Sequence, residues 1–281
     1  MRILRSLGDW ALFTSVFIAL CAVAMTASAL YFYNLPPHPL LLLFVFSGTL
    51  CSYNFHWMLT PELYGENSKA AWSYRHKKLH AFLFAIAGIA SVCCVWLLRA
   101  HWPWLLLTAF ITFLYSAPKL TFRPFTWLRQ VAVGKTAFLA LAWTHIPFIL
   151  PLLISGAVWR TQDYLLIFNR FYLIYPICIL FDHRDREADR REGIRSLVTQ
   201  LPDAGIARLF FGSMTVFFAS LVALGFMGQS PWTLAWLALP GVLLVYLYRA
   251  ALRERSDYFY YFVLDGLMAL SSVGLLMAVF T

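Results

Sequence analysis

The sequence predicts an all-α membrane protein with nine transmembrane helices and a cytoplasmic N-terminus. Hydrophobic residues make up 61% of the 281 residues and charged residues only 12%, about half the charged share of an ordinary soluble domain. The apolar residues form long runs, and the basic residues gather between alternate runs. Because no polar block or linker divides the chain, we expect residues 1–281 to form a single membrane domain.

The first half of the chain contains four of the predicted helices. Residues 10–33 form an uncharged run of 24 residues, and about 20 residues suffice to cross the hydrocarbon core. The Ala-Ser-Ala at 27–29 also matches a signal-peptidase site, but the length of the run favours a helix that is retained. A proline-rich turn follows, and three more helices are expected at 40–59, 81–98 and 102–117.

The second half contains five predicted helices. They lie at 131–155, at 164–181, in two parts of 209–248, and at 258–280. The run 209–248 has no charge over 40 residues, and Gly225, Gly228 and Pro231 divide it into two helices of ordinary length.

Three charged residues fall inside these predicted helices: Lys135, Arg170 and Asp265. Ionisable groups within a membrane are candidates for function, because burying one without a partner is costly. A contact with substrate is one interpretation. The alternative is a structural ion pair of Asp265 with Lys135 or Arg170.

The positive charge is concentrated on one side of the predicted topology. Of the 22 Lys and Arg residues, 18 fall in the N-terminal segment and in the loops 60–80, 118–130, 182–208 and 249–257. Short cytoplasmic loops of membrane proteins are enriched in these residues. The net charge of +9 therefore indicates a cytoplasmic face next to membrane lipid, and it does not indicate a nucleic-acid partner.

The segment 182–196 contains the acidic residues best suited to bind a metal ion. Asp182, Asp185 and Asp189 are spaced three and four residues apart, so their carboxylates share one face of a helix. Oxygen ligands of this kind suit Mg²⁺, which is usually shared between carboxylates and substrate phosphates. Gly193 predicts the end of that helix, and Ser196 a helix cap or a phosphate-binding hydroxyl. The alternative is a solvated interfacial helix with surface ion pairs.

Two segments resemble motifs of the UbiA superfamily of intramembrane prenyltransferases. The pattern from Asp182 through Asp185 and Asp189 to Gly193 and Ser196 is similar to the second motif of that family, whose carboxylates hold Mg²⁺ on an isoprenyl diphosphate. Tyr115-Ser116-Ala117-Pro118-Lys119 is similar to the Tyr-Ser-x-Pro-x segment of the family. The resemblance implies that Asp182, Asp185 and Asp189 are catalytic residues and metal ligands.

The first acidic motif of the family is incomplete in this chain. It falls on residues 54–62, where Phe55 and Met58 stand at two of the three acidic positions, and only Asn54 and Glu62 remain at the outer ones. The resemblance implies a substrate-binding set that adds four basic residues to these two: Asn54, Glu62, Lys69, Lys119, Arg123 and Arg195.

The resemblance implies a Mg²⁺-dependent enzyme that moves an isoprenyl group from its diphosphate to a lipophilic acceptor. An aromatic acceptor, of the quinone, haem or pigment type, is expected. The missing acids of the first motif leave a second function open. In that case a protein of the same fold would bind or transport an isoprenoid lipid without turnover.

Overall fold

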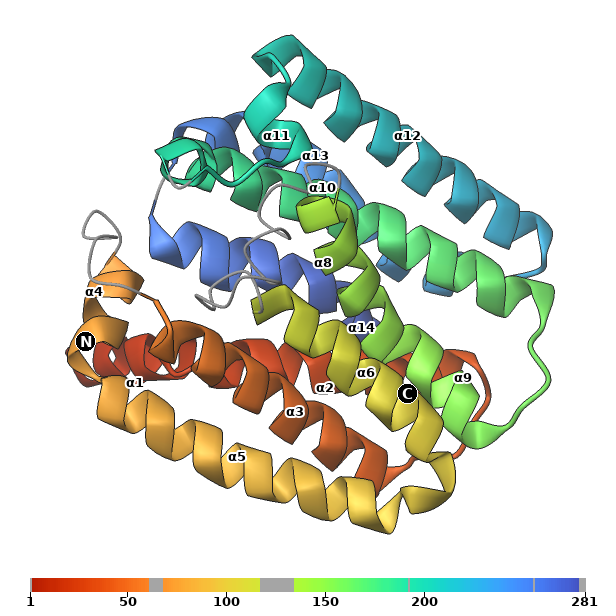
Figure 1. The fold of residues 1–281 in the computed structure, drawn as a ribbon. Coiled ribbons are helices and arrows are strands. Elements are labelled where there is room, and N and C mark those ends of the chain that lie inside the picture. The colour runs from red at the N-terminus through yellow and green to blue at the C-terminus, as the bar shows by residue number, and fades with distance from the viewer. Residues whose placement is uncertain (1, 61–67, 117–133, 192, 255, 278–281) are drawn as a thin grey trace.

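Helices are the regular secondary structure of the part of the chain that the structure describes. The computed structural model describes residues 2–60, 68–116, 134–191, 193–254 and 256–277, and no strand occurs among them. Long helices pack side by side in a bundle, joined by short connections (Figure 1). The predicted all-α class is confirmed.

Seven described helical segments are long and apolar enough to cross a membrane. They are α3 (Pro39–Met58), α5 (Lys77–Leu97), Lys135–Ser155, α10 (Thr161–Arg191), α12 (Asp203–Phe226), α13 (Pro231–Arg253) and Phe259–Met277. The apolar helices α2 (Val16–Phe32) and α6 (Trp102–Ser116) lie at two further predicted spans but have only 17 and 15 residues. The chain is therefore a multi-pass membrane protein, and the number of nine spans stays a prediction.

Two of these segments change their helical type along their length. Lys135–Ser155 consists of most of α8 (Gly134–Thr144), a π-helical turn η4 (His145–Ile149) and α9 (Leu150–Ser155). Pro147 lies within the π-helical turn, where its missing N–H removes a regular helical hydrogen bond. Phe259–Met277 likewise begins with a π-helical turn, η5 (Phe259–Leu264), and continues as α14 (Asp265–Met277).

The first predicted helix is wrong in one respect, because the chain breaks it in two. α1 (Arg2–Phe13) ends before Thr14, and α2 begins at Val16. Ser15 between them has a φ of 66°, a left-handed conformation that a side chain disfavours. Buried carbonyls at such a break need hydrogen-bond partners from elsewhere in the protein.

The helices that contact one another form a closed ring. α2 packs on α3, α3 on α6, α6 on α8, and α8 on α10. From there α10 packs on α12, α12 on α13, α13 on α14, and α14 returns to α2. Helix α5 lies against α3, and the short α4 (Ser68–Arg75) contacts α1, α3 and α5. The ring brings α8 and α10, which carry the charged groups described below, into contact.

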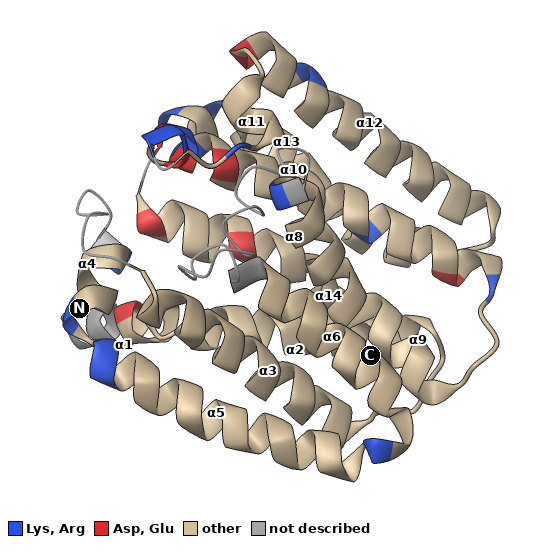
Figure 2. Ribbon diagram, viewed as in Figure 1, with Lys and Arg blue, Asp and Glu red and all other residues tan. Residues whose placement is uncertain are grey.

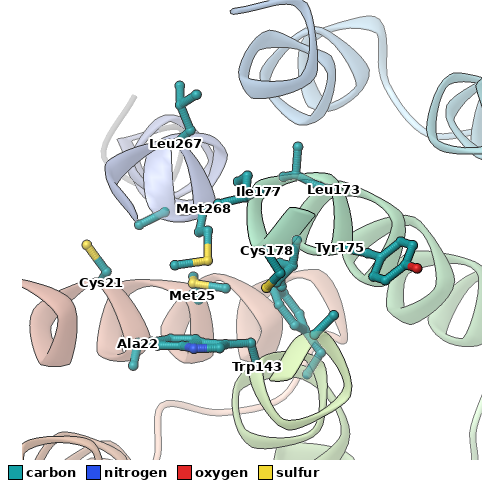
Figure 3. Close-up of a cluster of buried hydrophobic side chains, with 14 of the residues drawn as sticks. Cys21, Ala22, Met25, Trp143, Leu173, Tyr175, Ile177, Cys178, Leu267 and Met268 are labelled. Atoms are coloured by element: carbon teal, nitrogen blue, oxygen red, sulfur yellow. The ribbon is translucent and has the colours of Figure 1, made fainter. Parts of the chain in front are cut away.

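Four helices meet in the largest cluster of buried apolar side chains. Figure 3 shows side chains of α2, α8, α10 and α14 directed toward one another, with Met25, Trp143, Cys178 and Met268 among them. Cys178 is buried and carries a free thiol. These contacts fix α10 against α8, so the positions of the polar groups further along both helices are set by apolar packing.

Helix α10 is longer than the membrane requires. Its 31 residues span about 46 Å at 1.5 Å per residue, and the hydrocarbon core is about 30 Å thick. The helix ends at Arg191, and Gly193 follows with a φ of 70°. The N–H of Ile194 donates to the carbonyl of Asp189 at 2.9 Å, which closes the helix end. The predicted stop at Gly193 is confirmed, and the acidic segment continues the spanning helix.

Charged residues crowd one end of the bundle. Figure 2 shows acidic and basic residues gathered where α4, the start of α5 and the end of α10 lie, and few along the middle of the helices. The short helix α11 (Leu197–Gln200) lies at the same end. This distribution agrees with the one-sided loop charge in the sequence, and the cytoplasmic location of that end stays a prediction.

Candidate active site

The three predicted acidic residues lie near the end of α10 in different environments. Asp182 and Asp189 are buried, at 5% and 4% relative exposure. The side chain of Asp185 is 40% exposed. Two of the three carboxylates are therefore enclosed by protein, and the third is accessible to a ligand.

Lys135 of α8 joins the two buried carboxylates. Its Nζ lies 2.6 Å from Asp189 Oδ2 and 3.3 Å from Asp182 Oδ1. The next residue, Thr136, donates its hydroxyl to Asp182 Oδ2 through a short hydrogen bond. Asp182 and Asp189 therefore do lie on one face of α10, as the spacing predicts, and that face is turned toward α8.

Asp185 belongs to a second group of charges. The guanidinium of Arg184 donates to Asp185 Oδ1 at 2.9 Å and to the hydroxyl of Tyr261 at 3.0 Å. It also lies 3.7 Å from Asp257 Oδ1 and stacks against the ring of Tyr260. Arg184 is thus held between α10 and the C-terminal helix by several contacts, and it places a fixed positive charge beside the exposed carboxylate.

The residues present fit a metal only in part. Within the described ranges no three His, Cys, Asp or Glu side chains converge closely enough to hold an ion by themselves. Mg²⁺ commonly binds through one or two carboxylates together with substrate phosphates and water. Asp185 is the exposed carboxylate of the three, and both of its oxygens accept from Arg184, at 2.9 and 3.4 Å, so an ion held there would share it with that guanidinium. Asp182 and Asp189 contact the ammonium of Lys135 instead.

Asn54 and Lys69 both donate hydrogen bonds to carbonyls at the break between α1 and α2. The amide of Asn54 donates to the carbonyl of Thr14 at 3.1 Å and accepts from His80 Nδ1 at 2.7 Å. Lys69 Nζ donates to the carbonyl of Leu12 at 3.0 Å. Both side chains are buried. The predicted substrate-binding role of these two residues therefore coincides with a structural one, the capping of carbonyls that the break exposes.

The ammonium of Lys69 lies in a confined site. It is 4.0 Å from the ring centroid of Tyr261 and 4.9 Å from that of Trp57. Burial lowers the pKa of Lys69 to about 7, and the carboxylates of Asp265 and Asp257 oppose this shift. The backbone N–H of Lys69 also donates to Asp257 Oδ2 at 2.6 Å, so α4 is tied to the start of the last helical segment.

The other predicted substrate-binding residues are peripheral or outside the described ranges. Glu62, Lys119 and Arg123 lie outside the described residues, as do Ala117 and Pro118 of the Tyr-Ser motif. Arg195 is exposed, directly after the end of α10. Ser196 is fully buried and caps α11 through the backbone N–H of Thr199, so the predicted cap is confirmed.

An apolar cavity of about 420 Å³ opens between α3, α5, α6 and the segment 135–155. Phe55 lines it and packs on Phe84 with a centroid distance of 5.4 Å. Trp143 lines it from α8 and donates its Nε1–H to the hydroxyl of Tyr53 at 3.2 Å. Its wall includes Phe44, Val45, Gly48, Cys51, Val95, Leu105, Ala109, Leu139, Ala142 and Ile146. Phe55, which the sequence resemblance places at an acidic position of the first motif, thus lines an apolar cavity.

Neither of the two partners that the sequence suggests for Asp265, Lys135 and Arg170, pairs with it. Arg170 donates to the hydroxyl of Ser271 at 2.7 Å and to the amide oxygen of Asn169. Lys135 pairs with Asp182 and Asp189. The carboxylate of Asp265 instead favours the charged form of Lys69, and Arg184 is a second cation that acts on it. Helical spacing cannot identify such partners, because each pair joins segments that are distant in sequence.

Sequence reasoning missed the pairing of Lys135 and Thr136 with α10, and the contacts of Arg184. The signal that the sequence offers for Lys135 is a charged residue inside an apolar run. Thr136 carried none, since threonine is common in such helices. The contact between α8 and α10 that joins them is tertiary.

The chain is similar to one protein family and to two solved structures. The model of the UbiA prenyltransferase family matches residues 71–264, more than half of the chain. A UbiA homologue from Aeropyrum pernix K1 superposes with a TM-score of 0.67 at 12% identity, covering 96% of this chain and 98% of that one. A UbiA homologue from Archaeoglobus fulgidus superposes with a TM-score of 0.63 at 16% identity, covering 97% of this chain and 100% of that one. No curated protein sequence matches the chain.

Proposed function

The chain belongs to the UbiA prenyltransferase family, and on that premise we propose that it is an integral membrane enzyme that transfers an isoprenyl group from its diphosphate to a lipophilic acceptor. We further propose an aromatic acceptor, and a site on the cytoplasmic side of the membrane, the inner membrane if the source is bacterial. The orientation follows from the one-sided distribution of Lys and Arg.

The observation that carries this proposal is the arrangement of polar and apolar groups along α8. Lys135 and Thr136 at its start contact the carboxylates of α10. Leu139 and Trp143 follow at spacings of three to four residues and line the cavity, so they continue the same helix face. A cavity of about 420 Å³ is within the range that holds small ligands. A charged site about one helical turn from the wall of such a cavity suits a molecule with an anionic head and an apolar tail.

The chemistry requires positive charge where the diphosphate departs. The bond between the allylic carbon and the diphosphate oxygen breaks, the allylic carbon bonds to the acceptor, and the acceptor loses a proton. Positioned cations stabilise the negative charge that develops on the leaving oxygen. Lys135 and Arg184 supply two such charges from the described residues. By resemblance, Lys119, Arg123 and Arg195 add to them, with Glu62 at the edge of the site.

UbiA family enzymes generally use Mg²⁺-bound diphosphates, and when bound the ion would neutralise phosphate oxygens as a Lewis acid. Asp185 is the residue that would hold it here. Asp182 and Asp189 act indirectly, because they hold Lys135 in position. Asn54 and Lys69 support the site by holding α1, α3 and α4 together.

Binding of tritiated farnesyl and geranylgeranyl diphosphate to purified protein in nanodiscs tests the proposal. We expect Mg²⁺-dependent binding by the parent protein and at least a tenfold loss in Asp185→Asn. Asp203→Asn is the matched control, since this carboxylate lies at the same end of the bundle, is 84% exposed and pairs with Arg186 at 2.6 Å. Equal binding by the parent and Asp185→Asn would contradict the assigned role of Asp185.

Lipid analysis of a deletion strain separates transfer from simple binding. A prenylated product that disappears on deletion identifies both substrates. The second function, isoprenoid binding or transport, is favoured by one observation: Phe55 replaces a first-motif acid and lines the cavity. Diphosphate binding without any product that depends on the gene would support that function and reject transfer.

A further inference from the structure

We infer that Lys135 supplies the cation between Asp182 and Asp189, in the place where a metal ion would otherwise join two acidic residues to a diphosphate. The contact geometry carries this inference, and only the identity of the ligand rests on the proposed function. The protein would then need a divalent ion at Asp185 alone.

The contacts leave little room for a metal at these two residues. Lys135 Nζ lies within 3.3 Å of a carboxylate oxygen from each of Asp182 and Asp189. Thr136 donates to the second oxygen of Asp182. Both oxygens of Asp182 are therefore engaged by two consecutive residues of α8. A divalent ion would have to displace the ammonium from the same oxygens.

Charge and burial favour the ammonium in this position. Asp182 and Asp189 are almost fully buried, and two enclosed carboxylates need a compensating cation. Lys135 is fixed to the chain and is always available, whereas a metal must bind. If a metal entered, the ammonium would lose its partners and face a second cation. The lysine and the metal are thus competitors for one site.

The ammonium retains capacity for a ligand. A lysine has three N–H donors, and the contacts to Asp182 and Asp189 account for two. The Lys135 side chain is 33% exposed, so solvent or a phosphate oxygen can reach it. Lys135 is therefore suited to contact the diphosphate directly while the two carboxylates hold it in place. We class it as a substrate-binding residue, and Asp182, Asp189 and Thr136 as positioning residues.

Manganese binding tests the competition without any substrate. Mn²⁺ serves as a probe for Mg²⁺, and the free ion is measured by electron paramagnetic resonance with purified protein in nanodiscs. We expect Lys135→Met to bind Mn²⁺ at least tenfold more tightly than the parent, because the variant frees two adjacent carboxylates. Lys78→Met removes an exposed lysine from the start of α5 and should leave Mn²⁺ affinity unchanged. Equal affinity in the parent and Lys135→Met would overturn the inference.

A second pair of variants decides the matter if Lys135→Met does not fold. In the parent background, Asp182→Asn and Asp189→Asn should each retain Mn²⁺ affinity, because neither carboxylate ligates the ion while Lys135 is present. A tenfold loss in either variant would show that these carboxylates are metal ligands and would overturn the inference. Failure of every variant to bind an isoprenyl diphosphate would contradict the proposed function but leave the Mn²⁺ contrast intact.

Discussion

Removing the amide of Asn54 should destabilise the protein through the break in its first helix. In Asn54→Ala, the carbonyl of Thr14 and Nδ1 of His80 each lose a partner, at 3.1 and 2.7 Å in the parent. Interhelical hydrogen bonds in membranes contribute about 0.6 kcal/mol on average and up to about 1.7, and a buried polar group without a partner costs about 1–3 kcal/mol. We therefore expect a loss of about 2 kcal/mol in the free energy of unfolding.

The assay is reversible unfolding by SDS titration in mixed micelles, followed by tryptophan fluorescence. Thr215→Val is the matched control, since its hydroxyl bonds only to Phe211 in the same helix and the residue is exposed. That variant should change the free energy by less than about 0.5 kcal/mol. If Asn54→Ala resembles the control, the break does not depend on this cap. If instead stability holds while diphosphate affinity falls, Asn54 contacts substrate as the motif implies.

Three further predictions concern packing, charge and topology. Gly274→Ala should lower the melting temperature, because the added Cβ would lie 1.9 Å from Trp236 and overpacking costs about 1–3 kcal/mol. The control is Gly212→Ala, whose Cβ meets nothing within 4 Å and which should be neutral or slightly stabilising. Raising the pH from 7 toward 10 should stabilise the parent relative to Lys69→Met, because burial lowers the pKa of Lys69 in the folded chain and the unfolded chain therefore binds that proton more tightly. SDS titrations of both proteins at each pH measure this difference. Thiol-reagent labelling of single cysteines at the two ends should place them on opposite sides of the membrane, and labelling of both from one side would reject the nine-span topology.

Much of the fold follows from hydropathy and charge. Long apolar runs place the spanning helices, and the positive φ at Gly193 ends α10 where the sequence predicts it. The break at Ser15 could not be predicted, because neither Gly nor Pro occurs at residues 14 and 15. Its caps, Asn54 and Lys69, come from segments 40 and 57 residues further along. Local patterns do not contain such tertiary contacts.

In the candidate site, too, the sequence predicts the local geometry but not the tertiary contacts. Helical periodicity places Asp182 and Asp189 on one face of α10, since that property depends only on spacing. The cation that faces them is 54 residues away from Asp189 in sequence, so the spacing of the acids alone predicts a metal ion and not a lysine. Asp185 differs from Asp182 and Asp189 because its side chain is exposed and pairs with Arg184. The position of Arg184 depends on its contact with Tyr261 in the C-terminal helical segment, which the sequence does not reveal.

The break between α1 and α2 also has a consequence for biogenesis. During synthesis residue 14 emerges before residue 54, so the carbonyl of Thr14 precedes its donor Asn54, whereas the carbonyl of Leu12 already accepts from the N–H of Ser15 at 3.3 Å. Uncapped carbonyls are costly in lipid. The first helical pair should therefore remain beside the insertion machinery, or in contact with water, until α3 emerges. A lesion at residue 54 would then lower the yield of inserted protein, at the stage of assembly rather than of catalysis.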